Sequence, residues 1–168
     1  MNNKIIVIKN NNGSCSILHP APEMFDPNSR TRQALLENQI NFKDDEEVLQ
    51  FIINKDVPEG AAYRITTIDK LPSDKSFRNA WTDNFDTETV DVDIEKAKEL
   101  HKNTLRALRS PILAKLDVDY MRADEAGNEE LKKAIVEKKQ ALRDVTDLPL
   151  PEDVAQLKEF IPDILKNG

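Results

Sequence analysis

Apolar residues near the N-terminus are grouped in two short runs that a turn separates. Residues 5–8 are β-branched, residues 9–13 contain the Asn and Gly of a turn, and residues 14–18 alternate weakly between polar and apolar. Two such runs around a short turn predict a β-hairpin. Pro20 ends the second strand, because a proline nitrogen cannot donate to a strand ladder.

Two short helices and one strand are predicted between residues 26 and 68. Residues 26–29 have the composition of a helix start, and apolar residues follow at roughly helical spacing as far as Ile40. Asp44 or Asp45 is the expected N-cap of a second amphipathic helix. Residues 62–68 are β-branched, alternate, and lie between turn-forming sequences, so they are the clearest strand that the sequence predicts.

The segment after this strand has aromatic residues but no clear period. Phe77, Trp81 and Phe85 follow one another at four-residue steps, which is compatible with three turns of helix or with an irregular arm. Asp83 and Asn84 are weak helix formers. We therefore expect the irregular arm.

From residue 93 onward, apolar positions recur at steps of three and four, which predicts a long helix. Asp93 is its expected N-cap, and Pro111 is expected to kink or break it near residues 109–110. A second helix is expected from Glu129, and a last short amphipathic segment follows residues 147–151. The stripe of the long helix consists of Ile94, Ala97, Leu100, Thr104, Leu105, Leu108, Ile112, Leu116 and Tyr120.

These patterns predict an α+β fold that divides near residue 88. Residues 1–88 are expected to form a small mixed α/β docking domain with short strands. Residues 89–168 are expected to form a long-helix αα-hairpin with a short C-terminal helix. A stripe this narrow buries little area within one hairpin, and such hairpins usually complete their core against another helix or another copy. We therefore expect a homo-oligomer.

The composition argues against several classes of partner. Of 168 residues, 33% are charged and 5% are aromatic, and 24 Lys and Arg stand against 31 Asp and Glu, which gives a formal net charge of −7. An acidic chain is repelled by nucleic acid and by anionic membranes. No apolar run approaches the roughly 20 residues of a membrane span. We expect neither nucleic acid nor membrane as a partner, and a DNA-binding role is disfavoured.

Histidine and cysteine are too few for a recognisable metal site. His19 and His101 lie in different predicted units, and Cys15 is the single cysteine. A zinc site needs about four suitably spaced ligands, which the sequence does not offer. We expect His101 to be a satisfied or surface histidine and Cys15 to be structural. A Cys15–His19 nucleophile remains open.

Neither the carboxylates nor the glycines of the chain form a recognisable metal-binding or phosphate-binding motif. The acidic run at residues 44–47 begins a predicted helix, where negative charge is favoured, so we interpret it as capping. Asp117 and Asp119 lack the glycine and downstream glutamate of a calcium loop. With four glycines, the chain has no phosphate-binding loop. We expect no metal, no cofactor and no catalytic residue.

Residues 77–81, Phe-Arg-Asn-Ala-Trp, contain the only tryptophan of the chain beside an arginine. Large aromatic side chains next to Arg are typical anchors of interfaces. The alternative interpretation is that Trp81 packs into the α+β unit, and one residue can do both. The predicted partner-binding residues are Phe77, Arg78, Trp81 and Phe85 of this segment, with Leu105, Leu108, Ile112, Leu116 and Tyr120 of the helical stripe.

Several blocks resemble small virion and tail-associated proteins of tailed bacteriophages and prophages. They are Val-Pro-Glu-Gly-Ala-Ala-Tyr-Arg-Ile at residues 57–65, Leu-Pro-Ser-Asp at 71–74, and Phe-Arg-Asn-Ala-Trp at 77–81. Residues 111–123 and 139–145 are similar to the helical portion of these proteins, and Gln-Ala-Leu-Arg-Asp resembles the helical end of phage tail-fibre and tail-assembly proteins. The resemblance covers about residues 55–147. It implies a non-enzymatic structural or assembly role, in the virion and in the host cytoplasm during assembly.

Three functions stand as hypotheses. The first is a tail-associated virion protein that docks on a larger tail, fibre or portal-region protein through its α+β unit and packs its hairpin against itself or a fibre. The second is a transient tail or tail-fibre assembly chaperone, which would be absent from purified particles. The third is a small enzyme using Cys15 with His19 or the acidic run, which predicts that Cys15→Ala abolishes an activity.

Overall fold

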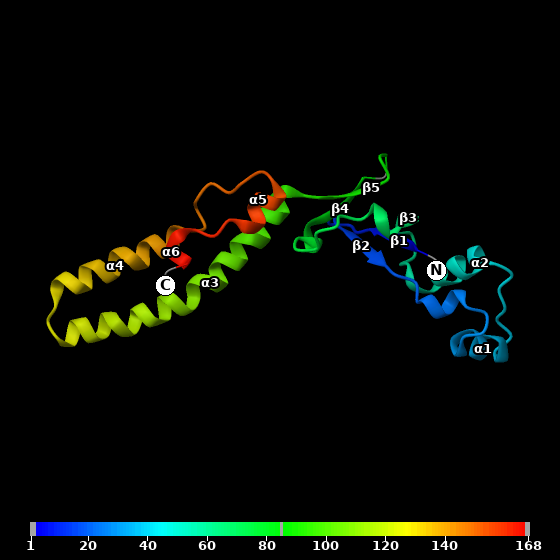
Figure 1. The fold of residues 1–168 in the computed structure, drawn as a ribbon, viewed down its shortest axis with the longest axis horizontal. Coiled ribbons are helices and arrows are strands. Elements are labelled where there is room, and N and C mark those ends of the chain that lie inside the picture. The colour runs from blue at the N-terminus through cyan, green and yellow to red at the C-terminus, as the bar shows by residue number, and fades with distance from the viewer. Residues whose placement is uncertain (1–2, 85, 167–168) are drawn as a thin grey trace. The chain divides into compact units, whose positions relative to one another are not determined.

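The computed structural model describes residues 3–84 and 86–166 and has the α+β architecture that the sequence predicts. A small N-terminal sheet of short strands precedes a pair of long helices and short C-terminal helices (Figure 1). The chain divides into two compact units, Met1–Val92 and Asp93–Gly168. This division falls after residue 88 because β5 (Thr89–Val92) pairs with a strand of the first unit.

Three antiparallel strands form the first sheet, in the order β2-β1-β3. The central strand β1 (Lys4–Lys9) pairs with β2 (Cys15–Leu18) on one edge and with β3 (Tyr63–Thr67) on the other. Gly13, in the turn between β1 and β2, has a φ of 77°, which glycine adopts without steric cost. The predicted hairpin and the predicted strand at residues 62–68 are both confirmed.

Strand β1 is buried on both faces because a separate layer covers each side of the sheet. Ile6 and Ile8 point to one face and pack against α2 (Asp45–Asp56), which contributes Val48, Leu49, Ile52 and Ile53. Ile5 and Val7 point to the other face and pack against Trp81 and Val90. The alternation of side chains along a strand therefore gives the first unit two small cores.

Two helices precede β3, as the sequence predicts. After a 3₁₀ turn, η1 (Pro22–Phe25), helix α1 (Arg30–Glu37) begins where the Ser29 side chain accepts from the backbone N–H of Arg32. Helix α2 begins where the Asp44 carboxylate accepts from the N–H groups of Glu46 and Glu47, each at 3.0 Å. The acidic run at residues 44–47 is thus confirmed as helix-capping chemistry.

The expectation of an irregular arm after residue 77 is wrong. Two 3₁₀ turns, η2 (Ile68–Lys70) and η3 (Arg78–Ala80), lead into β4 (Trp81–Asn84), which pairs with β5 as a two-stranded antiparallel hairpin. The polar residue Asp83 fits this strand because its carboxylate accepts from Nε and Nη2 of Arg64 on β3. Phe85 lies outside the described residues.

The second unit begins with α3 (Ile94–Glu125), which Asp93 caps as predicted. The helix does not break at Pro111, so that alternative of the prediction is wrong. Pro111 is exposed, and the loss of one backbone donor is tolerated within a helix of 32 residues.

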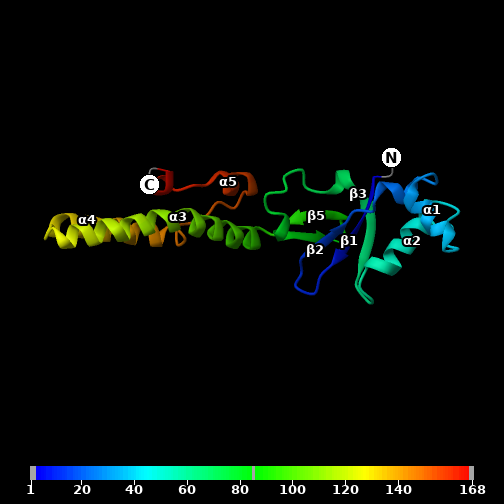
Figure 2. The same ribbon diagram turned by 90° about the horizontal axis from the view of Figure 1, so that it is seen from below.

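Helix α4 (Glu129–Asp144) returns antiparallel to α3, and a tail with α5 (Val154–Glu159) and α6 (Asp163–Lys166) follows. The hairpin core is built on Leu116, Ala123, Ile135 and Leu142. In the tail, α5 packs against α3 and α6 against α4, and the tail lies along the part of the helix pair that is farther from the α3–α4 turn (Figure 2). The hairpin is therefore closed by its own C-terminal segment.

Candidate functional site

The predicted partner-binding residues are divided between core and surface. Phe77, Trp81, Leu105 and Leu116 are buried within the chain, Ile112 and Tyr120 are half-buried, and Arg78 and Leu108 are exposed. The stripe that we expected to remain open is therefore mostly covered by α4 and by the tail. The burial of Trp81 shows that this side chain packs into the α+β unit. That Trp81 also binds a partner stays a prediction.

A second row of apolar and small residues lies on the exposed side of α3. The stripe predicted from the sequence includes the first two members of this row, Leu100 and Thr104, but not the other five. The spacing of the row alternates between four and three residues, which is the spacing of a coiled-coil seam. Val118 is 41% exposed and Met121 is 56% exposed. We call this row the outer stripe; it consists of Leu100, Thr104, Ala107, Pro111, Ala114, Val118 and Met121.

The outer stripe points away from α4. A helix turns by about 100° per residue, so Ala114 and Val118, each two residues from Leu116, lie roughly 160° from it around the helix. Leu116 is buried against Ile135 and Leu142 of α4. The outer stripe therefore lies opposite the hairpin core, and all of its members are exposed except Leu100, which is half-buried.

Charge is distributed unevenly along α3. Residues 94–110 carry five basic and two acidic side chains, a net charge of +3, and residues 111–125 carry two basic and four acidic side chains, a net charge of −2. Two copies of α3 placed antiparallel would bring each positive half against a negative half. Placed parallel, they would bring like halves together.

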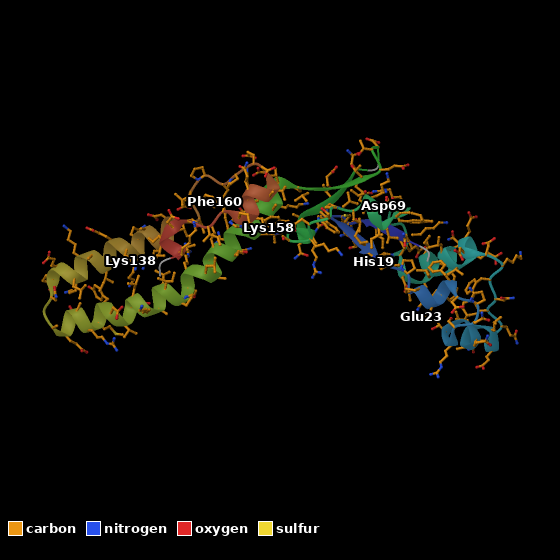
Figure 3. All side chains as sticks on the ribbon, in the orientation of Figure 1. His19, Glu23, Asp69, Lys138, Lys158 and Phe160 are labelled. Atoms are coloured by element: carbon orange, nitrogen blue, oxygen red, sulfur yellow. The ribbon has the colours of Figure 1, made fainter. Side chains whose placement is uncertain are left out.

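The first unit contains a cavity of about 300 Å³ beside β2, which we call the β2 cavity. Cys15, Ile17 and His19 reach it from β2 and the residue after it, because alternate residues of a strand point to the same side. His19 is labelled in Figure 3. The rest of the lining comes from the loop before β4 and consists of Leu71, Lys75, Arg78, Asn79 and Trp81.

The geometry of β2 argues against a Cys15–His19 catalytic pair. Four residues along an extended strand span about 13 Å, beyond the combined reach of a cysteine and a histidine side chain. A thiol nucleophile needs its base within hydrogen-bond distance. The two residues therefore share a cavity without forming a dyad.

A second cavity of the first unit, of about 540 Å³, is mainly apolar. It lies where the end of β2 meets η1, α1 and α2. Its apolar lining includes Leu18, Met24, Leu35, Phe51 and Ile52. An apolar hollow between helices is the kind of surface on which a partner segment docks.

The described residues hold no group of three or more His, Cys, Asp or Glu side chains that could bind a metal ion. His101 is buried, and its Nε2 lies 2.7 Å from the carbonyl oxygen of Phe160, so it is the satisfied histidine that the sequence predicts. Within residues 3–84 and 86–166, no helix is both long and apolar enough to span a bilayer.

In the second unit, shifted pKa values mark ion pairs on helix surfaces rather than a reactive centre. A hydrogen bond from Lys102 lowers the pKa of Glu99, and one from Lys166 lowers the pKa of Asp163. Hydrogen bonds to Glu152 and Glu95 raise the pKa of Lys98. These groups pair along or between helices, as structural ion pairs do.

Comparison of the chain with protein-family models, with curated proteins and with solved structures finds no match. The function is therefore argued from the surfaces described above.

Proposed function

We propose that this chain is a non-enzymatic structural or assembly protein that self-associates through the outer stripe of α3. The exposed row of apolar and small residues on α3 is the observation that carries the proposal. A helix that buries one stripe within its hairpin and presents a second at coiled-coil spacing has the pattern of a helix that packs on two sides.

The proposed occupant of the outer stripe is a second copy of α3 in antiparallel orientation. The +3 and −2 halves of the helix attract each other in this arrangement. Ala107 and Ala114 lie near the middle of the stripe, where small side chains allow two helices to approach closely. Leu100, Val118 and Met121 lie toward its ends, where they add apolar area.

The proposal includes docking of the α+β unit on a larger protein. The mainly apolar cavity between η1, α1 and α2 supports this role. That the larger protein belongs to a phage tail rests on the resemblance over about residues 55–147. Mass spectrometry of purified particles from the source tests it: stoichiometric copies support a virion component, whereas presence in infected-cell lysate alone indicates an assembly chaperone.

Sedimentation velocity of the full chain tests the self-association. The wild type should sediment as a dimer or larger species at chain concentrations on the order of 100 µM, because a small interface gives modest affinity. Val118→Glu with Met121→Glu should give a monomer with an unchanged circular dichroism spectrum, since both side chains are exposed.

Leu131→Glu with Val136→Glu on α4 is the matched control. Leu131 is 47% exposed and Val136 is 50% exposed, and both lie outside the outer stripe. The same two introduced charges on α4 should leave the association unchanged. A wild type that is monomeric throughout, or a control that dissociates as far as the α3 variant does, would contradict the proposal.

A further inference from the structure

The β2 cavity combines an apolar interior with a rim of hydrogen-bond donors. Trp81 is 5% exposed and forms the floor, and Cys15, Ile17 and Leu71 are half-buried walls. Exposed side chains form the rim: His19, Lys75, Arg78 and Asn79. None of the residues that line the cavity is an acid, although the chain has 31 acidic residues and a net charge of −7.

The two cations at the rim of this cavity have no acidic partner among the described residues. The indole Nε1 of Trp81 is buried and makes no hydrogen bond there. The side chains of Lys75 and Arg78 make no ion pair within that part of the chain, whereas Lys98 and Lys132 each pair with two carboxylates. Because the Nε1 atom is itself covered, the charged groups at the rim, and not the indole N–H, are the donors that a ligand reaches.

We propose that the β2 cavity binds a carboxylate that carries a short aliphatic body. The guanidinium of Arg78 offers two parallel N–H donors that match a carboxylate, and Lys75 adds a second positive charge. The aliphatic part contacts Ile17, Leu71 and the face of the Trp81 ring. This site is independent of the outer stripe and goes beyond the proposed function.

The size of the cavity restricts the ligand. About 300 Å³ is the lower end of the range for small-molecule sites, so the cavity accommodates one leucine-sized group rather than a nucleotide. Such a carboxylate has two sources with the same chemistry. One is a free small carboxylic acid, and the other is the C-terminal residue of a polypeptide.

The sole tryptophan of the chain gives a direct readout, because Trp81 lies in the cavity. We would titrate the full chain with 4-methylpentanoate, with the peptide acetyl-Gly-Ser-Leu bearing a free C-terminus, and with its C-terminal amide. Both carboxylates should change the Trp81 fluorescence and shift its single indole N–H resonance in NMR, whereas the amide should not. If the peptide binds at least tenfold more tightly than the free acid, the source is a polypeptide C-terminus. If the two bind equally, the source is a free acid.

Variants at the rim separate this site from a general attraction of anions. Arg78→Gln and Lys75→Gln should each weaken carboxylate binding about tenfold without changing the melting temperature, because both side chains are exposed. Lys133→Gln on α4 removes an exposed cation elsewhere and should have no effect. The proposal is overturned if the amide binds as well as the acid, if both rim variants bind like the wild type, or if no carboxylate perturbs Trp81.

Discussion

Loss of the Asp83 carboxylate should destabilise the first unit by about 3–5 kcal/mol, the usual cost of breaking a buried ion pair. Asp83 accepts from Nε and Nη2 of Arg64 over 2.6–3.0 Å, which ties β4 to β3. The Asp83 side chain is 0% exposed and that of Arg64 is 12% exposed, so little water can replace the lost partner. The hydrogen bond to Asp83 raises the pKa of Arg64, so the guanidinium stays charged.

The assay is urea unfolding at neutral pH, followed by Trp81 fluorescence, because Trp81 begins the strand that contains Asp83. Asp83→Leu leaves the Arg64 guanidinium without a counter-charge and should show the full loss. Arg64→Met combined with Asp83→Leu removes both charges and should recover much of the lost stability. Exposed ion pairs contribute less than about 1 kcal/mol to the free energy of unfolding. A loss of that size in the single variant would refute this reasoning. A double variant that is no more stable than the single variant would refute it too.

Two further substitutions test the second unit. Leu142→Ala removes a side chain that is 0% exposed and should lower the free energy of unfolding of the second unit by about 2–5 kcal/mol. Circular dichroism during urea unfolding measures this loss, and the transition seen by Trp81 fluorescence should not move. A loss below about 1 kcal/mol would mean that the hairpin core is not packed as described. Pro111→Ala restores a backbone donor in an exposed stretch of α3 and should raise stability by up to about 3 kcal/mol; an unchanged or lower melting temperature would show that the proline is accommodated without cost.

Elements with a strong local period could be predicted from the sequence. Residues 62–68 are recognisable by their β-branched composition and the turns that flank them, although Tyr63 and Ile65 are exposed. The apolar steps of α3 and α4 are recognisable because recurring side chains such as Leu116 and Leu142 are buried. The β4–β5 hairpin could not be predicted in this way. A buried strand position is unfavourable for Asp83 unless its charge is paired, and its partner, Arg64, lies 19 residues earlier in the chain. Such long-range pairing has no local signature in the sequence.

The candidate surfaces were only partly visible in the sequence. Arg78 and Trp81 were singled out by their composition, but the approach of Cys15 and His19 to them depends on the packing of β2 beside the loop before β4. The outer stripe was recognised only at Leu100 and Thr104, because Ala107 and Ala114 are small and Pro111 resembles a helix breaker. Its heptad spacing was present in the sequence, and a search for a second stripe on α3 would have found it.

Disulfide cross-linking between copies of α3 tests the central claim most directly. In a Cys15→Ser background, one chain would carry Thr104→Cys and another Val118→Cys. These two positions are about 21 Å apart along the helix, so they meet only in an antiparallel pair. The account predicts rapid cross-linking in the mixture and little in either variant alone. Cross-linking of Thr104→Cys to itself as fast as in the mixture, or no cross-linking at all, would contradict it.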